Sequence, residues 1–245
     1  RPTKQHVKLW LKLAEGGNPK FQANLGKAFA LGCGVEQDSK QAVFWYRKAA
    51  EQGHTHAQFN LASALDAGAG VAKDDQQAAI WWRKAAEHGD VLAQYNLGNY
   101  FLTGRGVAQS DKQATFWWRK AAEQGNAEAQ FNVAVSLQHG RGVEQDEKQA
   151  AFWYRNAAER GHAQAQGNLA VAFLYGLGVD KDAKQATRWF SKAAEHGGAQ
   201  EQFALAFRLH VELADMPSAE RWIQKALVTA KANDFGYLMQ LAVHL

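Results

Sequence analysis

Residues 55–89 read THAQFNLASALDAGAGVAKDDQQAAIWWRKAAEHG, and this stretch recurs along the 245-residue chain at a fixed period. Five Gly-x-Gly-Val segments and five Ala-Ala-Glu segments repeat in the same register, and each Ala-Ala-Glu segment is followed two positions later by glycine. One tryptophan series has a constant step of 36 residues: Trp45, Trp81, Trp117, Trp153 and Trp189. Self-similarity at such a period is typical of a repeat protein.

Each repeat is predicted to be a pair of helices. Ala57, Leu61 and Leu65 have helical spacing, which predicts a first helix over 55–67 that Gly68 ends. Asp74, three residues before Gln77, is typical of a helix N-terminus, so a second helix is expected from there to Gly89. Equivalent N-terminal pairs occur in the other repeats: Asp38/Gln41, Ser110/Gln113, Asp146/Gln149 and Asp182/Gln185. We call the two helices of a repeat helix A and helix B.

The predicted fold class is therefore all-α, an α/α solenoid of about six 36-residue helical hairpins. A single hairpin cannot bury its apolar face alone and has to stack on its neighbours. The expected organisation is one solenoid over 1–245. Its parts are an N-terminal half repeat at 1–17, five regular repeats at 18–197, a degenerate sixth repeat at 198–230 and a C-terminal capping helix at 231–245.

Composition excludes several classes of protein. The chain is 47% hydrophobic and 21% charged, which is typical of a folded core. No stretch reaches the ~18 apolar residues needed for a transmembrane helix. Cys33 is the single cysteine, which excludes an intrachain disulfide framework and an all-thiolate zinc site. The net charge of +4 falls short of what nucleic-acid binding requires. Because the sequence begins at Arg1, we expect that a preceding segment has been removed.

No residue pattern in the chain favours catalysis. The repeated aspartates are explained as helix N-caps. The two closest histidines, His54 and His56, have no carboxylate or cysteine at metal-ligand spacing. The paired glycines are not followed by the Lys-Ser/Thr of a phosphate loop. The repeated Arg-Lys pairs on helix B lie near glutamates, which indicates a solvated mixed-charge face. We therefore predict no catalytic residue, no metal and no cofactor.

The pattern A-x-A-Q-F-N-L-A, G-x-G-V, D-x-x-Q-A and W-Y-R-K-A-A-E-Q-G resembles the Sel1-like repeat, a relative of the tetratricopeptide repeat. The resemblance covers nearly the whole chain and implies a right-handed superhelix. It also implies protein–protein interaction, in bacterial adaptors, scaffolds and regulators of the envelope or of host contact. Some members resemble immunity proteins of secreted toxins. A cysteine-rich branch is described as binding penicillin, but its paired cysteines are missing here.

Helix A provides the candidate binding residues. At about 100° per residue, positions 56, 59, 63 and 66 lie roughly 140° to 160° from the core direction set by Leu61. The resemblance to the tetratricopeptide arrangement implies that helix A lines a concave groove. Core positions hardly vary between repeats, whereas these positions change in charge and size. The candidates are His56, Leu92, Glu128, Gln164; Phe59, Tyr95, Phe131, Gly167; Ser63, Asn99, Val135, Val171; Asp66, Leu102, Gln138 and Leu174.

Helix A carries three further series of residues. Two of them have a structural and a binding interpretation, and the third has a structural interpretation alone. The aromatic series Phe59, Tyr95 and Phe131 either packs on the neighbouring helix A or contacts a partner, and Gly167 interrupts it, where we expect a local pocket. A second series either bonds an adjacent helix or grips the backbone of an extended peptide: Asn60, Asn96, Asn132 and Asn168. A third series is interpreted as structural: Gln22, Gln58, Gln94, Gln130, Gln166 and Gln202.

The predicted function is a non-catalytic scaffold that binds another protein or peptide in the helix A groove, such as an immunity protein or an envelope regulator. A monomer in the bacterial periplasm or envelope is favoured over a cytoplasmic protein. Two alternatives stay open. One is a hydrolase acting on cell-wall or β-lactam-type substrates, by analogy with the cysteine-rich relatives. The other is a glycan-binding module that uses the aromatic series.

Overall fold

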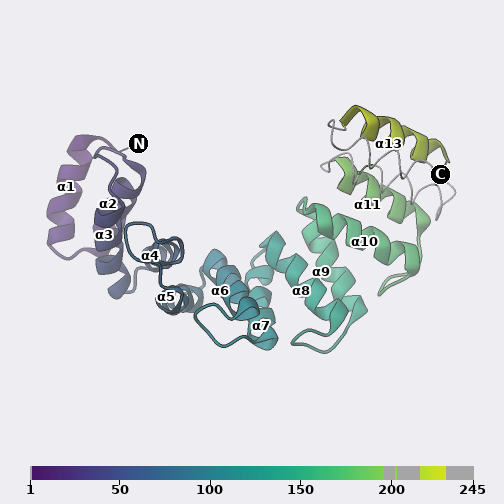
Figure 1. Ribbon diagram of the computed structural model, residues 1–245, viewed down its shortest axis with the longest axis horizontal. Coiled ribbons are helices and arrows are strands. Elements are labelled where there is room, and N and C mark those ends of the chain that lie inside the picture. The colour runs from purple at the N-terminus through teal and green to yellow at the C-terminus, as the bar shows by residue number, and fades with distance from the viewer. Residues whose placement is uncertain (1, 196–201, 203–215, 230–245) are drawn as a thin grey trace. The chain divides into compact units, whose positions relative to one another are not determined.

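The computed structural model describes residues 2–195, 202 and 216–229 (Figure 1). These residues form helices and connecting loops, with no strand in the described ranges. In chain order the helices are α1 (Lys4–Glu15), α2 (Pro19–Leu31), α3 (Ser39–Glu51), α4 (Thr55–Ala67), α5 (Asp75–Glu87), α6 (Val91–Thr103), α7 (Asp111–Glu123), α8 (Ala127–His139), α9 (Glu147–Glu159), α10 (Ala163–Tyr175), α11 (Ala183–Glu195) and α13 (Met216–Thr229).

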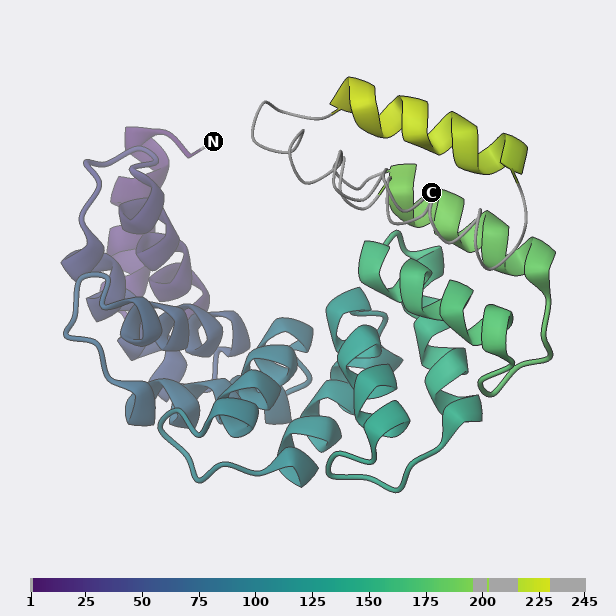
Figure 2. The same cartoon turned by 45° about the vertical axis from the view of Figure 1, so that its right-hand side comes forward.

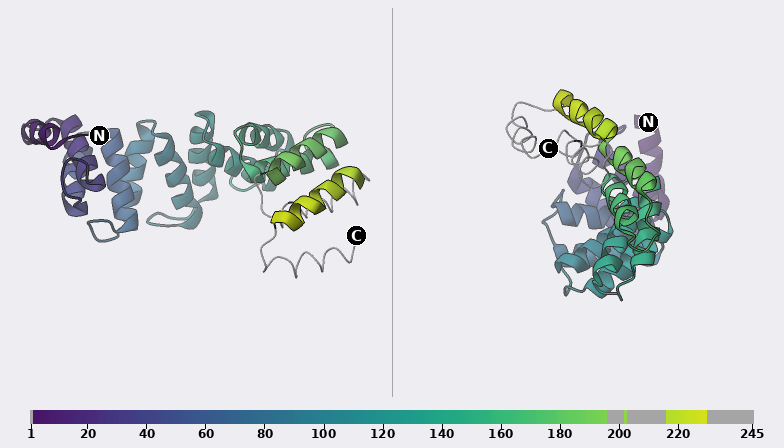
Figure 3. Two further views of the ribbon diagram at one scale, coloured as in Figure 1. Left: turned by 90° about the horizontal axis from the view of Figure 1, so that it is seen from above. Right: turned by 90° about the vertical axis from the view of Figure 1, so that its right-hand side faces the viewer.

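Consecutive helices pack as hairpins, in two compact units over 1–126 and 127–245. In the first unit, helix A pairs with helix B in α2/α3, α4/α5 and α6/α7, and each of α1, α3 and α5 also packs on the helix A that follows it. In the second unit, α8/α9 and α10/α11 are the hairpins, and α9 packs on α10. Figures 2 and 3 show the same pairs from other sides. The predicted all-α fold of packed helical hairpins is confirmed.

The helix ends lie where the repeated polar residues and glycines predict them. Oδ1 of Asp74 accepts a hydrogen bond of 2.9 Å from the amide of Gln77 and so starts α5. Helix α4 ends at Gly68, whose φ of 70° is left-handed. The expected N-caps are confirmed in the other four repeats, where the residue accepts from the backbone amide three positions later: Asp38, Ser110, Asp146 and Asp182.

The second glycine of the loop packs against the backbone that precedes it by about 31 residues at four positions: Gly34, Gly70, Gly106 and Gly178. A Cβ added at Gly70 would lie 2.2 Å from the carbonyl oxygen of Ser39, the first residue of α3. The equivalent Cβ at Gly106 would lie 2.0 Å from the Asp75 carbonyl oxygen. No side chain fits in that space, so these loops approach the neighbouring repeat to a distance that only glycine allows.

The core consists of small residues on both helices, a leucine or valine of each helix A in the register of Leu61, and the aromatic pair of helix B. Leu61 and Leu97 are completely buried, as are Ala57 and Ala85. Trp81 and Trp82 on α5 are 6% and 2% exposed. The many tryptophans of the composition are therefore largely packing residues, since only Trp10 and Trp153 are half-buried rather than buried.

Buried glutamines connect each helix A to the helix B before it. Nε2 of Gln58 donates to the carbonyl oxygen of Ala50, and Nε2 of Gln94 donates to that of Ala86, at 3.2 and 3.1 Å. The same bond occurs at three other positions of the series: Gln22, Gln166 and Gln202. The structural interpretation is confirmed for these five glutamines.

Helix α1 packs on α2 as α3 and α5 pack on the helix A that follows each of them. Helix α1 packs Val7 and Ala14 against Leu25 of α2. At the other end, α13 is the helix that carries Trp222. The first helix of the degenerate sixth repeat and the capping helix expected at 231–245 lie outside the described residues, apart from Gln202.

Candidate partner-binding face

We define the helix A face as the candidate residues of α4 and α6 in the first unit and of α8 and α10 in the second. The candidate at the second residue of each helix A is exposed: His56, Leu92, Glu128 and Gln164. The side chain of His56 is 83% exposed, and Leu92 is 53% exposed. Leu102 is also exposed, and the other candidates are half-buried. The helical-wheel argument therefore places an exposed edge correctly, with a half-buried flank beside it.

The exposed position of one helix A contacts the N-cap of the next helix A. Nδ1 of His56 lies 3.7 Å from Oδ2 of Asp90, whose other oxygen caps α6 by accepting from Ala93. In the second unit, Oε2 of Glu128 lies 3.3 Å from Nε2 of His162, which caps α10. The sequence analysis missed Asp90 and His162. Their place directly before each helix A was the signal that could have identified them.

His54 caps α4 in the same way, through Nδ1 accepting from the amide of Ala57 at 3.2 Å. Burial lowers the pKa of His54 below its ordinary value of 6.5, and the nearby His56 ring adds to this effect. Because the neutral ring is the form that accepts the amide hydrogen bond, the lowered pKa and the capping role agree.

The aromatic series packs within the protein. The ring of Phe59 meets Trp82 of its own hairpin edge-on, with 5.0 Å between centroids. The ring of Phe131 stacks on His162 at 4.5 Å and also lies near Tyr154. Tyr95 is half-buried. The packing interpretation is thus supported for Phe59 and Phe131, and each ring keeps part of its surface exposed.

Gly167 stands where the aromatic series has a ring in three other repeats. A Cβ added there would meet no atom within 4 Å, so the space beside this glycine is open. It is also a helical glycine, and it needs no left-handed backbone. A partner side chain has room at this point of α10.

The half-buried asparagines differ in their hydrogen bonding. Within the described ranges, no hydrogen bond joins the side chains of Asn60, Asn96 or Asn132 to another residue. The side chain of Asn168 lies beside the Tyr154 hydroxyl of the adjacent α9, where it partly offsets the burial that raises the pKa of this tyrosine. Three of the four amides therefore have free donors and acceptors on this face.

The remaining candidates are engaged to different degrees. Oδ1 of Asn99 accepts from the indole nitrogen of Trp118 at 3.1 Å, and Ser63 bonds back to its own helix. Oε1 of Gln138 accepts from the hydroxyl of Tyr154 at 2.5 Å. Three others are apolar and half-buried: Val135, Val171 and Leu174.

Asp66 is paired within the protein. The guanidinium of Arg105, in the loop after α6, donates to Asp66 and also, at 2.7 Å, to Asp75 at the start of α5. It lies 4.7 Å from the centroid of Tyr100. The Arg105 guanidinium lowers the pKa of Asp75 below its usual range. The charge of Asp66 is thus compensated, and its carboxylate is less available to a partner than the sequence suggested.

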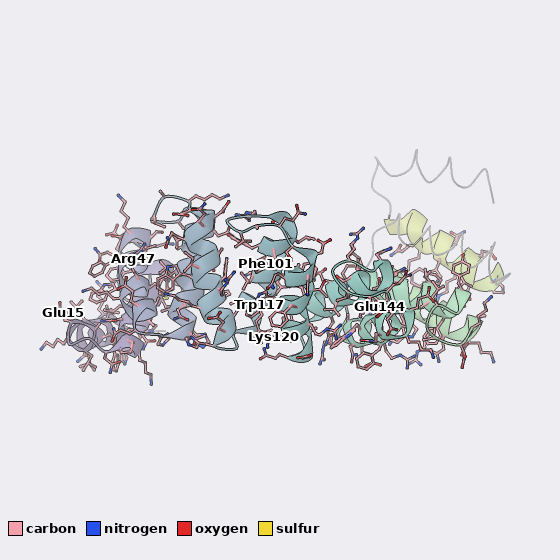
Figure 4. All side chains as sticks on the ribbon, turned by 90° about the horizontal axis from the view of Figure 1, so that it is seen from below. Glu15, Arg47, Phe101, Trp117, Lys120 and Glu144 are labelled. Carbon is pink, nitrogen blue, oxygen red and sulfur yellow. The ribbon has the colours of Figure 1, made fainter. Side chains whose placement is uncertain are left out.

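Helix B carries a second exposed apolar series that the sequence analysis did not single out. Phe44, Ile80 and Phe116 are 46 to 49% exposed in the first unit, and Phe152 is 57% exposed in the second. Nζ of Lys48 lies 4.6 Å from the Phe44 ring centroid, and that of Lys120 lies 5.2 Å from the Phe116 ring. Figure 4 labels Lys120 and the buried Trp117 on α7. Their 36-residue spacing was the signal that could have identified them.

No group of three His, Cys, Asp or Glu side chains in the described part of the chain is placed to hold a metal ion. None of the described helices combines the length and the apolar character that a bilayer crossing requires.

The model of the Sel1 repeat family matches residues 19–54, 55–90, 91–126, 127–162 and 163–198. The chain belongs to the Sel1 repeat family. Each match begins at the first residue of a helix A, from α2 to α10, and ends three residues after the last residue of the helix B that follows it. Sel1 repeat proteins generally bind other proteins. The search of curated proteins found no match.

Two solved Sel1 repeat structures are similar over most of the chain. A protective antigen of uropathogenic Escherichia coli that displays an SLR fold is 34% identical, with a TM-score of 0.86 over 97% of this chain. The chain spans 52%, about half, of that antigen. A Sel1 repeat protein from Oxalobacter formigenes is 31% identical, with a TM-score of 0.81, over 91% of this chain and 93% of its own.

Proposed function

We propose that this Sel1 repeat chain is a non-catalytic adaptor that binds a partner protein or peptide along the helix A face. The observation that carries the proposal is the combination, on α4 and α6, of exposed Leu92 and Leu102 with the unbonded amides of Asn60 and Asn96. Exposed leucines offer apolar area to a partner, and free amides offer both donors and acceptors.

Binding of an extended segment is the mode that these side chains suit. An Asn amide has two donors and an acceptor, so it can pair with both the N–H and the C=O of a peptide backbone. Asn60 and Asn96 occupy the same register in consecutive repeats, so each would meet a different residue of the bound segment. Leu92 and Leu102 would then contact its side chains. Backbone pairing provides affinity, and the variable positions provide selectivity.

The test compares two faces of one protein. Leu92→Asp on the helix A face is paired with Ile80→Asp on helix B, a residue of similar exposure. Each variant and the wild type serve as bait for proteins of the source bacterium, with circular dichroism as the check of folding. A protein that the wild type and Ile80→Asp capture and Leu92→Asp loses supports the proposal. Equal loss in both variants contradicts it.

The identity of such a protein distinguishes the two finer roles within the proposal, since a secreted toxin indicates an immunity protein and an envelope component indicates a regulator. Gly167→Phe provides a second test on α10, because the added ring occupies the open space there. Unchanged affinity of this variant for the captured partner would exclude Gly167 from the binding surface. Turnover of cell-wall or β-lactam substrates by the purified chain would contradict the non-catalytic assignment.

A further inference from the structure

A small pocket of about 40 Å³ lies in the second unit where α8, α9 and α10 meet. Ala151, Ala172 and Leu177 form part of its apolar wall. Its polar groups include Gln138, Tyr154 and Asn168. We call this site the Ala172 pocket.

The equivalent place in the first unit, two repeats earlier, is filled by the protein itself. Tyr100 stands in the register of Ala172, and its side chain is buried, with 3% exposed. The Tyr100 hydroxyl lies beside Asp66 and Trp82, and Arg105 lies over its ring. In the second unit the corresponding positions hold Gln138, Tyr154 and Leu177. The repeat frame therefore accommodates a phenol at this place, and the second unit supplies none.

The inner end of the Ala172 pocket keeps hydrogen-bonding groups where Tyr100 has its hydroxyl. The Tyr154 hydroxyl donates to Oε1 of Gln138 at 2.5 Å, and the Asn168 side chain lies beside the same hydroxyl. The amide nitrogen of Gln138 makes no hydrogen bond to any described residue, so its two N–H donors are available.

We propose that the Ala172 pocket binds a tyrosine side chain of a partner protein or peptide, with the ring between Ala151 and Ala172 and the hydroxyl accepting from Gln138. The source of the tyrosine rests on the proposed function, because α10 contributes both to the pocket and to the helix A face. The shape and chemistry of the pocket do not depend on it.

The lining favours tyrosine over arginine and phenylalanine. Leu177 replaces Arg105, so the wall on this side of the pocket is apolar. An arginine side chain would lose its hydration there, and the exposed Glu147 is the one carboxylate among the described lining residues that could balance its charge. A phenylalanine would bury the Gln138 amide without an acceptor, which costs affinity. A phenol covers the apolar wall and also satisfies the amide.

Another repeat provides an internal control. Ala64 stands in the same register between the first two hairpins, but Val43 replaces Ala151 there and Ala30 replaces Gln138. That place has a bulkier wall and lacks the amide. Changing Ala151 to valine in the Ala172 pocket therefore copies a wall that the chain already contains.

The experiment titrates p-cresol, the tyrosine side chain without its backbone, into the full chain and follows backbone amides by NMR. We expect saturable shifts centred on Ala151, Ala172 and Leu177, and binding of toluene at least about fivefold weaker because it lacks the hydroxyl. Ala172→Tyr, which fills the pocket as Tyr100 does, and the more conservative Ala151→Val should both abolish the p-cresol shifts.

Three results would overturn the proposal: no saturable binding of p-cresol, equal binding of toluene, or preferential binding of n-propylguanidinium at these amides. Persistence of the shifts in folded Ala151→Val would also place p-cresol elsewhere. Failure of the proposed function is separate, because p-cresol binding needs no partner. If p-cresol binds while Leu92→Asp loses no captured protein, the proposal for the Ala172 pocket is supported and the proposal for the helix A face is contradicted.

Discussion

The guanidinium of Arg105 donates a 2.7 Å hydrogen bond to Oδ1 of Asp75, and so joins the loop after α6 to the first turn of α5. The same guanidinium nitrogen bonds to Asp66 near the end of α4. One side chain of the third hairpin thereby holds both helices of the second. The carboxylate at the start of α5 also lies at the positive end of that helix.

This ion pair predicts an acid-dependent loss of stability. Because Arg105 lowers the native pKa of Asp75 below its ordinary 3.8, the pair stabilises the fold fully above about pH 4. The contribution is lost as the pH falls through the lowered native pKa. Asp75→Asn should therefore be less stable than the wild type near neutral pH, and the difference in melting temperature should disappear at the acid end. Glu87→Gln, which removes an exposed carboxylate with no ion pair among the described residues, is the control.

Two helical glycines should respond oppositely to alanine. A Cβ at Gly98 of α6 would lie 2.4 Å from Cδ1 of the buried Trp118, so Gly98→Ala should destabilise the chain by roughly 1 to 3 kcal/mol. A Cβ at Gly167 meets no atom, so Gly167→Ala should stabilise it by about 0.5 to 1 kcal/mol through the reduced entropy of the unfolded chain. Urea unfolding followed by tryptophan fluorescence measures both. Changes of the same sign would contradict this packing.

The buried glutamines should contribute measurably to the contact between repeats. Gln94 donates to Ala86 and accepts from Gln124, and Gln94→Met keeps its length while removing both bonds. We expect a loss of about 1 kcal/mol in the free energy of unfolding, since the Ala86 carbonyl keeps a second donor in Gly89. Gln76→Met, on the exposed side of α5, should change it by less than about 0.5 kcal/mol. A similar effect of the two changes would mean that the buried amide is dispensable.

Buried tyrosines should weaken the fold in alkali. Burial raises the pKa of Tyr46 to about 12, whereas the unfolded chain releases this proton near 10. Stability is therefore full below pH 10 and falls as the pH rises from there to about 12. Tyr46→Phe removes the titrating hydroxyl, so its melting temperature should fall less steeply over this range than that of the wild type. Identical slopes would show that Tyr46 ionises in the native state as it does in the unfolded one.

The sequence predicts the hairpins closely because their signals are local and repeated. The N-cap of α5 at Asp74 and the end of α4 at Gly68 each depend on a few neighbouring residues, and five copies in register reinforce each signal. The buried face of helix A follows from the same periodicity. These features need no knowledge of which repeat packs on which.

The candidate site was predicted less completely because its chemistry depends on residues far apart in the chain. Asp66 looked available until the structure placed Arg105, 39 residues later, beside it. Phe131 could pack or bind, and the choice depends on His162, the N-cap of the next helix A. Helical geometry gives the direction of a side chain, but its neighbours are set by how repeats stack.

The glycine contact at Gly70 also restricts how such a chain can change its length. The Gly70 loop touches the Ser39 carbonyl 31 residues earlier, and Gly106 stands at the same separation from Asp75. Duplicating or deleting any 36-residue window, wherever it starts, leaves every such glycine opposite a matching carbonyl. A gain or loss that is not a whole number of 36-residue repeats shifts this register, so a side chain can come to lie in a space that admits none. New members with more or fewer hairpins can therefore arise by recombination at arbitrary points, provided that the exchange conserves the phase of the repeat.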